Sequence, residues 1–487
     1  MAPSLEKRRL LTLVACVMGS SLAFIDATVV VVALPTMGAD LDMTLAGQEW
    51  VFLSYSLALA ALYLPAGAVG DRWGRRETFM AGAAGFAVAS ALAGFAPNAA
   101  TLVGARFVQG VAGAFLTTNS LALIREVYGK DSGRAVGLWT SLTGVATIAG
   151  PPAGGLLVEW DWRAIFFINL PLAAVTVALA LAGRCPTRAA HRVGALDLPG
   201  ALLAAAGFGA LTYGIVEGAE NGFDTLWWAF AVAVAALVGF IVVERRVPEP
   251  MLPLNLFRRR NFAAANLETF FVYAGLSGVL LYWTLYLQFL GFSPFEAGLL
   301  NMPISVVMIL LAARFGMLAD RYGPRLFLTL GPALIGTGML LFVPMAEKDD
   351  FWTFGVAGVA VFSLGLALVV APITATALSS APGRYAGIAA GVNSTVSRVG
   401  GLLAVAVIGL VVTLVFEGQA GSAEAVPLAR GQDDPGLRSA SVDAFRWGMV
   451  VAASLSFAGA AVAALGISNA EAREAREIDA APAPAET

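Results

Sequence analysis

The chain has 487 residues, of which 58% are hydrophobic and only 13% charged, and its mean hydropathy is +0.78. A water-soluble protein of this length would need far more polar surface, so the composition predicts an integral membrane protein with many spans. The two cysteines, Cys16 and Cys185, argue against a disulfide framework, and the single His191 excludes sites that need two imidazoles.

Fourteen apolar runs are each long enough to cross a hydrocarbon core of about 30 Å as a helix. The first six lie at 10–34, 49–69, 78–96, 100–124, 135–158 and 164–183. Two more lie at 197–217 and 226–243, and the last six at 262–290, 296–318, 325–345, 352–378, 386–416 and 443–467. We therefore expect an all-α integral membrane protein with two six-helix bundles and two extra transmembrane helices.

This reading divides the chain into four parts. The N-terminal bundle covers 1–184, a linker with the two additional helices covers 185–260, and the C-terminal bundle covers 261–468. The remaining residues, 469–487, are acidic and rich in Ala and Pro. Because they have no apolar face to bury, we expect a disordered cytoplasmic tail.

The basic residues indicate the orientation. With the N-terminus inside, 23 of the 30 Lys and Arg fall in cytoplasmic segments and two, Arg106 and Arg398, fall inside helices. The five on the outer side are Arg163, Lys348, Arg430, Arg438 and Arg446. This bias predicts that both the N- and the C-terminus are cytoplasmic.

A short basic turn between the second and third runs recurs in degenerate form in the second half of the chain. The first copy contains Gly67, Asp71, Arg72, Gly74, Arg75 and Arg76, and the second contains Gly316, Asp320, Arg321, Gly323 and Arg325. Two equivalent turns imply two equivalent bundles moving about a shared path, which is the organisation of a membrane transporter. Asp71 could accept hydrogen bonds from the start of a neighbouring helix and latch the cytoplasmic side. The alternative is a loop held inside by its charge, with no gating role.

Arg106 lies about two turns inside the fourth run, where an arginine costs roughly 2.5 to 3.5 kcal/mol and needs a partner. Asp26 in the first run is the best candidate, because the two helices run in opposite directions and place both residues in the outer half. A carboxylate beside an arginine stays ionised, whereas one separated from it in an apolar site takes up a proton. We expect Asp26 to bind the proton and Arg106 to tune it; a fixed ion pair is the alternative.

Other polar and aromatic residues fall at membrane depth. Glu268 is predicted either to form a second proton or cation site or to face cytoplasmic water. Aromatic side chains suit an apolar or cationic aromatic ligand, although lipid-facing belts explain them equally well. The candidate residues of a substrate cavity are Trp50, Tyr55, Gln109, Asn119, Trp139, Tyr273, Tyr286, Gln288, Asn393 and Arg398.

These motifs resemble the major facilitator superfamily. Its signature loop is similar to the turn at Gly67, and the resemblance implies that Asp71 contacts a helix start near 383–387 and that Arg75 pairs with Glu126. The run Gly150, Pro151, Gly154 and Gly155 resembles the superfamily's antiporter motif G-P-x-x-G-G. Simple helix packing explains those small residues equally well.

Two further runs resemble narrower groups within that superfamily. The fourth-helix motif of its proton-coupled exporters is similar to Leu102, Arg106, Gln109, Gly110 and Gly113. The first-helix signature of its fourteen-span drug–proton antiporter branch is similar to Asp26, Thr28, Ala33, Leu34 and Pro35, with Val31 where an Asn is common. The resemblance covers all fourteen spans.

The resemblance implies a secondary active exporter of lipophilic or cationic small molecules in a bacterial inner membrane, working by proton antiport with alternating access. A lipid or lipoprotein-linked exporter and a metabolite importer of the same fold are the alternatives. We expect the proton gradient to supply the energy, because the lack of a G-x-x-x-x-G-K-[ST] run argues against direct ATP drive. We also expect no cofactor and no metal. The expected partners are a small-molecule substrate and membrane lipids, without nucleic acid or an obligate protein partner, and we expect a monomer. Scattered acids and one histidine argue against an enzyme.

Overall fold

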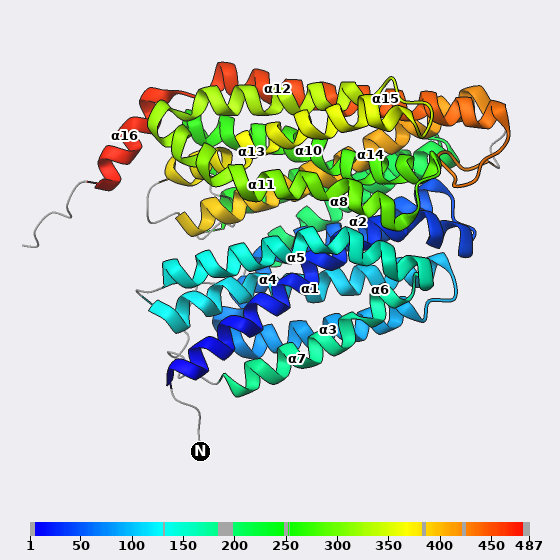
Figure 1. Cartoon of the computed structure of the whole chain (residues 1–487). Helices are drawn as coiled ribbons and strands as arrows, with labels where there is room; N and C mark the ends of the chain where they lie inside the picture. Colours follow the sequence, from blue (N-terminus) through cyan, green and yellow to red (C-terminus); the bar gives the residue numbers. More distant parts are fainter. Residues whose placement is uncertain are drawn as a thin grey trace, which may run out of the picture.

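The structure, a computed structural model, describes residues 5–129, 132–183, 198–247, 252, 254–381, 386–420 and 425–480. Within these residues all regular structure is helical, and 14 helices are long and apolar enough to cross a membrane. The spans run roughly parallel to one another (Figure 1). This confirms the expected all-α architecture and its fourteen spans.

The N-terminal bundle contains six spans. They are formed by α1 (Leu5–Asp40), α2 (Leu45–Trp73), α3 (Arg75–Gly94), α4 (Ala99–Tyr128), α5 (Ser132–Trp160), and α6 (Ala164–Phe167) with α7 (Asn169–Ala182). The last span is divided at Ile168, close to Pro171, which lacks the N–H that a continuous helix would need. Thr44 and Asn98 cap α2 and α4 by accepting backbone N–H groups of the first turn.

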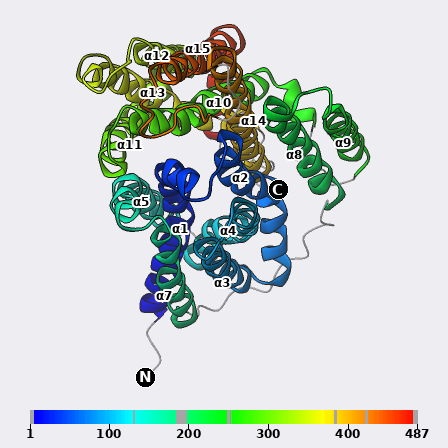
Figure 2. The ribbon, with the colours of Figure 1, turned by 90° about the vertical axis from the view of Figure 1, so that its right-hand side faces the viewer.

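The C-terminal bundle contains the last six spans. They are formed by α10 (Arg260–Phe289), α11 (Pro294–Tyr322), α12 (Pro324–Phe342), α13 (Val356–Ser379) preceded by a π-helical turn at Phe351–Gly355, α14 (Ala386–Ala420) and α15 (Pro435–Gly466). A view along the helices shows the two bundles side by side (Figure 2).

Glycines allow equivalent helix pairs to pack closely in both bundles. A Cβ atom on Gly82 of α3 would lie 2.7 Å from the backbone nitrogen of Leu116 in α4. In the second bundle a Cβ on Gly365 of α13 would lie 2.7 Å from the carbonyl oxygen of Gly331 in α12. Small residues bring membrane helices together through van der Waals contact, where apolar surroundings offer little hydrophobic driving force.

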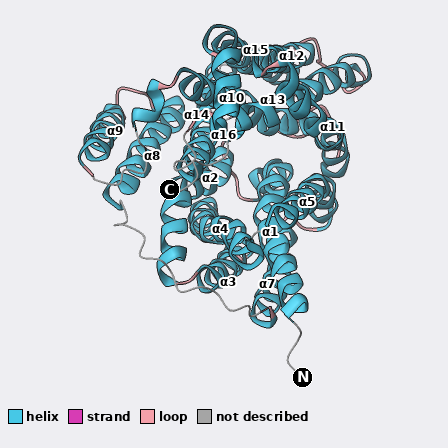
Figure 3. Cartoon of the chain, turned by 90° about the vertical axis from the view of Figure 1, so that its left-hand side faces the viewer, coloured by secondary structure: helices cyan, strands magenta, loops and turns pink. Residues whose placement is uncertain are grey.

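The extra helices α8 (Leu198–Asn221) and α9 (Trp227–Arg246) pack against each other on one flank of the molecule. Helix α8 contacts both α2 and α14, and so it covers the line where the bundles meet. Helices α5 and α11 meet on the other flank (Figure 3). A 3₁₀ turn at Leu254–Arg258 lies between α9 and α10 in the chain.

The two copies of the basic turn have the same backbone geometry. Gly74 joins α2 directly to α3 with φ 103° and ψ 124°, and Gly323 joins α11 directly to α12 with φ 95° and ψ 147°. A positive φ in this range is costly for residues with a Cβ, so both positions favour glycine. The sequence repeat is therefore also a structural repeat.

The expectation of a disordered tail is wrong for its first part, because Asn469–Ala480 forms helix α16. Asn469 Oδ1 accepts a hydrogen bond from the Arg325 N–H at 3.1 Å, and the Glu471 carboxylate accepts from the Asn261 N–H at 3.3 Å. The segment is rich in Ala, Glu and Arg, which are good helix formers. Its anchors are polar, so the lack of an apolar face did not prevent order. Residues 481–487 lie outside the described part of the chain.

Candidate functional site

A buried ion pair links helices α1 and α4. Arg106 Nη1 lies 2.5 Å from Asp26 Oδ2, and the two residues are 0% and 3% exposed. The structure thus brings together the two charges that the sequence analysis expected to meet. Removing one member of such a pair leaves an uncompensated charge and typically costs about 3 to 5 kcal/mol.

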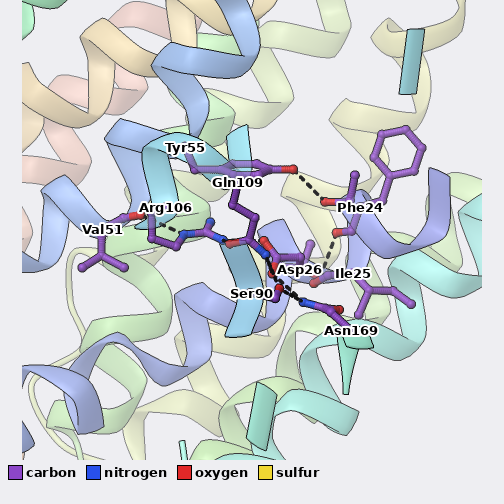
Figure 4. A network of polar contacts seen from close by, with 11 residues as sticks. Phe24, Ile25, Asp26, Val51, Tyr55, Ser90, Arg106, Gln109 and Asn169 are labelled. Atoms are coloured by element: carbon purple, nitrogen blue, oxygen red, sulfur yellow. Dashed lines mark hydrogen bonds and ion pairs between the residues drawn. The ribbon is translucent and has the colours of Figure 1, made fainter. Parts of the chain in front are cut away.

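Amide and hydroxyl groups complete the surroundings of the Asp26 carboxylate (Figure 4). Its Oδ1 accepts hydrogen bonds from Gln109 Nε2 at 2.8 Å and from Asn169 Nδ2 at 3.0 Å. Both amides also donate to the hydroxyl of Ser90, at 2.7 and 2.9 Å. Four helices, α1, α3, α4 and α7, therefore hold one carboxylate from several sides.

Tyr55 of α2 covers the arginine of this pair. Its ring centroid lies 4.3 Å from Arg106 Cζ, and its hydroxyl donates to the Ala23 carbonyl at 3.3 Å. Arg106 Nε also donates to the carbonyl of Val51, one turn earlier on α2, at 3.2 Å. Helix α2 can approach this closely because position 110 of α4 is glycine, where a Cβ would collide with the Tyr55 carbonyl oxygen.

A cavity of about 420 Å³ lies between the bundles on the other side of Tyr55. Its walls come from α1, α2, α4, α10 and α14. The lining residues are Ala23, Phe24, Ala27, Phe52, Tyr55, Ser56, Leu59, Thr117, Tyr273, Ser277, Ser394, Ser397, Arg398, Gly401 and Leu402. Asp26 is not among them, so Tyr55 separates the ion pair from the cavity.

Arg398 is the one charged side chain in this lining. Its guanidinium lies over the ring of Tyr63, 4.8 Å from the centroid. Among the described residues no carboxylate forms an ion pair with it. The cavity therefore combines apolar and hydroxyl-bearing walls with a single positive charge.

The bundles are joined at the ends of the helices that lie far from the N-terminus. There Gln288 Nε2 of α10 donates to the Val32 carbonyl of α1 at 2.9 Å. Six residues earlier on α10, the hydroxyl of Tyr282 lies 2.7 Å from Glu49 Oε1 of α2. We call this region, marked by Gln288–Val32 and Tyr282–Glu49, the outer seam.

Comparison with known sequences identifies the family. Residues 16–405 match the profile of the Major Facilitator Superfamily. The chain belongs to this superfamily. This confirms the family that the turn at Gly67 and the run at Gly150 predicted.

Curated relatives of this major facilitator protein align over most of its length. It is 33% identical over 419 residues to the multidrug resistance protein Stp of Mycobacterium tuberculosis, covering 84% of this chain and 76% of that protein. It is 34% identical over 415 residues to the tetracenomycin C resistance and export protein of Streptomyces glaucescens, covering 84% and 77%. It is 36% identical over 425 residues to the puromycin resistance protein of Streptomyces alboniger, covering 84% and 82%.

A solved transporter structure shares the fold of this chain. A bacterial homologue of the human lysosomal transporter Spinster, in an inward-facing and unoccupied conformation, matches with a TM-score of 0.68. The match covers 98% of this chain and 99% of that one at 18% identity. At this identity the likeness concerns the fold alone, and it confirms the expected major facilitator architecture.

The signature turn of this major facilitator protein forms a small charge network. Arg75 Nε lies 2.7 Å from Asp71 Oδ1, and Arg75 Nη1 lies 3.8 Å from Glu126 Oε2, the pairing that the family resemblance implied. The implied contact of Asp71 near 383–387 cannot be placed, because 382–385 lie outside the described residues. Gly67 of the same motif packs beside Thr118. The remaining gating candidates, Arg72, Asp320 and Arg321, have exposed side chains.

Replacing Asp71 by Asn should reduce transport at least tenfold while membrane insertion stays normal. The amide keeps the shape of the side chain but removes the charge that holds Arg75. Transport assays on variants matched for membrane abundance would check this. Glu77→Gln is the control, because Glu77 has a 59% exposed side chain on the same face and contacts Arg76 at 3.6 Å. Unchanged transport by Asp71→Asn would reject a role in gating.

The antiporter motif lies where α5 meets α1 and α11. Gly150 and Gly154 face α1, and a Cβ on Gly155 would lie 2.5 Å from the Pro294 carbonyl oxygen of α11. Reciprocally, a Cβ on Gly298 of α11 would collide with the Pro151 carbonyl oxygen. The motif therefore packs the two bundles against each other, so the packing interpretation left open by the sequence is satisfied. Its relation to antiport remains a proposal.

Only Tyr55, Tyr273 and Arg398 of the ten predicted cavity residues line the cavity. Five of the others bond within their own bundle or site: Gln109 to Asp26, Asn119 to the Ala66 carbonyl, Trp139 to Ser20, Tyr286 to the Met345 carbonyl, and Asn393 to Thr269. The other two form contacts between elements, Gln288 with Val32 and Trp50 with Glu217 of α8. These seven do not line this cavity in the present structure, because their polar groups bond to nearby acceptors or donors instead, and their role in substrate binding stays a prediction.

Glu268 of α10 is fully buried, and neither carboxylate oxygen has a hydrogen-bond partner. The alternative that it faces cytoplasmic water is therefore wrong. It is also absent from the lining of the cavity. A role as a second proton site stays a prediction.

Sequence reasoning missed three residues that the structure places in functional positions. Ser90 and Asn169 bind the Asp26 site, and Glu49 lies in the outer seam. Asn169 is a polar residue inside the sixth apolar run, 164–183, and that position was an available signal. Glu49 sits beside Trp50 at the very start of an apolar run, where a charge is easily read as a helix boundary. Ser90 carries no signal of its own.

Proposed function

We propose that this protein is a proton-driven exporter of lipophilic small molecules in the cytoplasmic membrane of a bacterium. The basic turns and both termini would then face the cytoplasm, in keeping with the distribution of Lys and Arg. The relatives named for resistance and export support the direction of transport. The observation that carries the proposal is the Asp26–Arg106 pair directly behind the Tyr55 wall of the cavity.

Tyr55 would couple the two sites. In the present state the Asp26 carboxylate is paired with the Arg106 guanidinium. A substrate that moves Tyr55 or α2 would shift the guanidinium, because Tyr55 and the Val51 carbonyl both contact it. A change of arginine position in turn removes the positive charge that faces the Asp26 carboxylate. Proton binding and substrate binding would thus favour different states, as antiport requires.

Glu268 would be a second proton carrier. An ionised carboxylate at this position has no donor and no cation in the described part of the chain, which is costly in an apolar interior. A protonated acid is neutral and avoids most of that cost. The residue lies on α10, which also carries Tyr273 of the cavity wall.

The charge of the cavity favours neutral substrates or substrates with acidic or acceptor oxygens. Arg398 is the only charged lining residue and would repel a cation. Of the two substrate types expected from the sequence, lipophilic and cationic, the cavity supports the lipophilic one. The hydroxyl groups of Ser277, Ser394 and Tyr273 could orient such a compound.

Alternating access would follow from rocking of the two bundles about this cavity. The outer seam is closed in this structure, so the state corresponds to an outward-closed one under the proposed orientation. One proton moving down 100 mV and one pH unit releases about 2.3 plus 1.4 kcal/mol. For a neutral substrate this sustains roughly a 500-fold gradient.

The proposal is tested in proteoliposomes with an acidic lumen and a pH indicator inside. Tetracenomycin C is offered outside, and protein-free liposomes correct for passive entry. We expect protein-dependent accumulation in the lumen, accompanied by proton loss from it. Accumulation that ignores the pH gradient would overturn proton coupling. Movement of substrate in the same direction as the protons, rather than in the opposite direction, would favour an importer instead.

A further inference from the structure

Glu49 places a buried carboxyl group in the outer seam. It lies on α2 and is 3% exposed, while Tyr282 on α10, which it contacts, is 0% exposed. The Tyr282 hydroxyl is 2.7 Å from Glu49 Oε1 and 2.9 Å from the Val405 carbonyl oxygen of α14. This contact joins one helix of the N-terminal bundle to two helices of the C-terminal bundle, so it must break when the seam opens.

If Glu49 is ionised, this contact has too few hydrogen atoms to form both of its hydrogen bonds. A tyrosine hydroxyl has one proton to donate, yet it lies within hydrogen-bond distance of two acceptors, a carboxylate and a carbonyl. A proton on the Glu49 carboxyl group supplies the missing donor. The Glu49 hydroxyl can then donate to the Tyr282 oxygen, and the Tyr282 hydroxyl can donate to Val405.

Helix α14 packs closely against the pair at Gly409. Gly409 of α14 faces both side chains, and a Cβ there would collide with Glu49 Oε1 and lie 2.5 Å from the Tyr282 hydroxyl. Glycine at this position therefore allows α14 to close directly over the carboxyl group. With only 3% of Glu49 exposed, little water can solvate a negative charge there.

The charged neighbours of Glu49 are acidic. On α8, Glu217 accepts a hydrogen bond from the adjacent Trp50 at 2.8 Å, and Glu220 accepts from the Ala46 N–H at 3.3 Å. Glu417 lies further along α14. In the described part of the chain no lysine or arginine forms an ion pair with Glu49. This contrasts with Asp26, whose charge Arg106 balances.

We propose that Glu49 is a proton-binding site that locks the outer seam, with the proton taken from the outer solution when the seam is open. Closing the seam over an ionised Glu49 would bury a charge without a counterion. Acidity on the outer side would therefore favour the closed state. This site is separate from Asp26; only the assignment of this face to the outside rests on the proposed function.

The experiment compares Glu49→Gln and Tyr282→Phe with the unaltered protein. Glutamine keeps the shape of the protonated acid and can donate to Tyr282 permanently, whereas phenylalanine removes the bridge to Val405. Tyr286→Phe is the matched control, because the Tyr286 hydroxyl bonds only to the Met345 carbonyl at 2.6 Å within its own bundle. Purified protein in lipid nanodiscs is used, without substrate or gradient.

Opening is measured as the distance between spin labels at Trp160→Cys and Trp352→Cys, in a background with Cys16 and Cys185 replaced by Ser. Both tryptophans are exposed, at 82% and 69%, and lie at this end of opposite bundles. In the unaltered protein we expect the open fraction to rise up to tenfold per pH unit as pH increases. Glu49→Gln should stay closed at every pH, and Tyr282→Phe should be open at least tenfold more often than Tyr286→Phe. Equal pH dependence with and without Glu49 would overturn the proposal.

A spectroscopic measurement on the unaltered protein tests the proposal even if the variants fold poorly. Infrared spectra of the unaltered protein should contain a carboxylic acid carbonyl band that shifts in D₂O and disappears when the seam is forced open at high pH. Absence of any such band attributable to Glu49 would also overturn the proposal. Neither measurement depends on transport. A negative result would therefore reject the role of Glu49 without bearing on the proposed export function.

Discussion

Replacing Asp26 by Asn should abolish proton-driven accumulation of substrate while exchange of substrate across a membrane without a gradient continues. Asparagine preserves the size of the side chain and can still bond to Gln109 and Asn169. It cannot take up and release a proton at neutral pH. This variant should therefore lose accumulation driven by a pH gradient but keep equilibrium exchange. A variant that merely damages the cavity should lose both activities.

The Asp26→Asn change leaves the Arg106 charge buried without its partner, which should lower the stability of the folded protein. Removing one member of a buried pair typically costs about 3 to 5 kcal/mol, although Gln109 Oε1 still accepts from Arg106 Nη1 at 2.6 Å. The double variant Asp26→Asn with Arg106→Gln removes both charges and should fold more stably than Asp26→Asn alone. It should show the same separation of accumulation from exchange.

Ser90→Ala provides the matched control for this site. It removes the hydroxyl that both amides share but leaves the ion pair and its net charge intact. We expect a loss of accumulation of no more than about fivefold, which is the factor that corresponds to a lost hydrogen bond of about 1 kcal/mol. If Asp26→Asn retained full pH-driven accumulation, Asp26 would be a structural ion-pair residue and not the coupling site.

The sequence was sufficient to predict the architecture and this pair because both follow from strong constraints. A hydrocarbon core demands long apolar helices, and a charge inside it demands a partner. Arg106 and Asp26 were the deep charges of one bundle, and opposite helix directions put them at the same depth. The fold and the centre of the site could therefore be reached without knowing which helices touch.

The cavity lining could not be predicted in the same way, because it depends on the rotation of each helix. Tyr273, Tyr282 and Tyr286 all lie on α10, yet the first lines the cavity, the second lies in the outer seam and the third packs inside its own bundle. The Tyr286 ring stacks on Phe445 with centroids 3.6 Å apart, a contact between segments far apart in sequence. Apolar periodicity is weak in helices that are buried on most sides, so the sequence does not fix which face meets the cavity.

Inverting the charge of Arg398 should reverse the charge preference of the transporter. The Asp26–Arg106 pair is neutral as a unit and lies behind Tyr55, so Arg398 alone sets the charge that a substrate in the cavity meets. Two unit charges 4 Å apart interact by about 4 kcal/mol at an effective dielectric constant of 20. Arg398→Glu should therefore weaken binding of an anionic compound by far more than tenfold and create binding of lipophilic cations.

The neutral variant Arg398→Gln separates charge from shape. It should reduce binding of anionic compounds at least tenfold but change binding of neutral ones by less than threefold, because the apolar walls and the hydroxyl groups remain. Arg438→Glu is the control for added negative charge, since Arg438 lies against Phe289 outside the cavity. Binding is measured by calorimetry on purified protein with one anionic, one neutral and one cationic lipophilic compound. If the three compounds kept their order of affinity in Arg398→Glu, the substrate would bind somewhere other than this cavity.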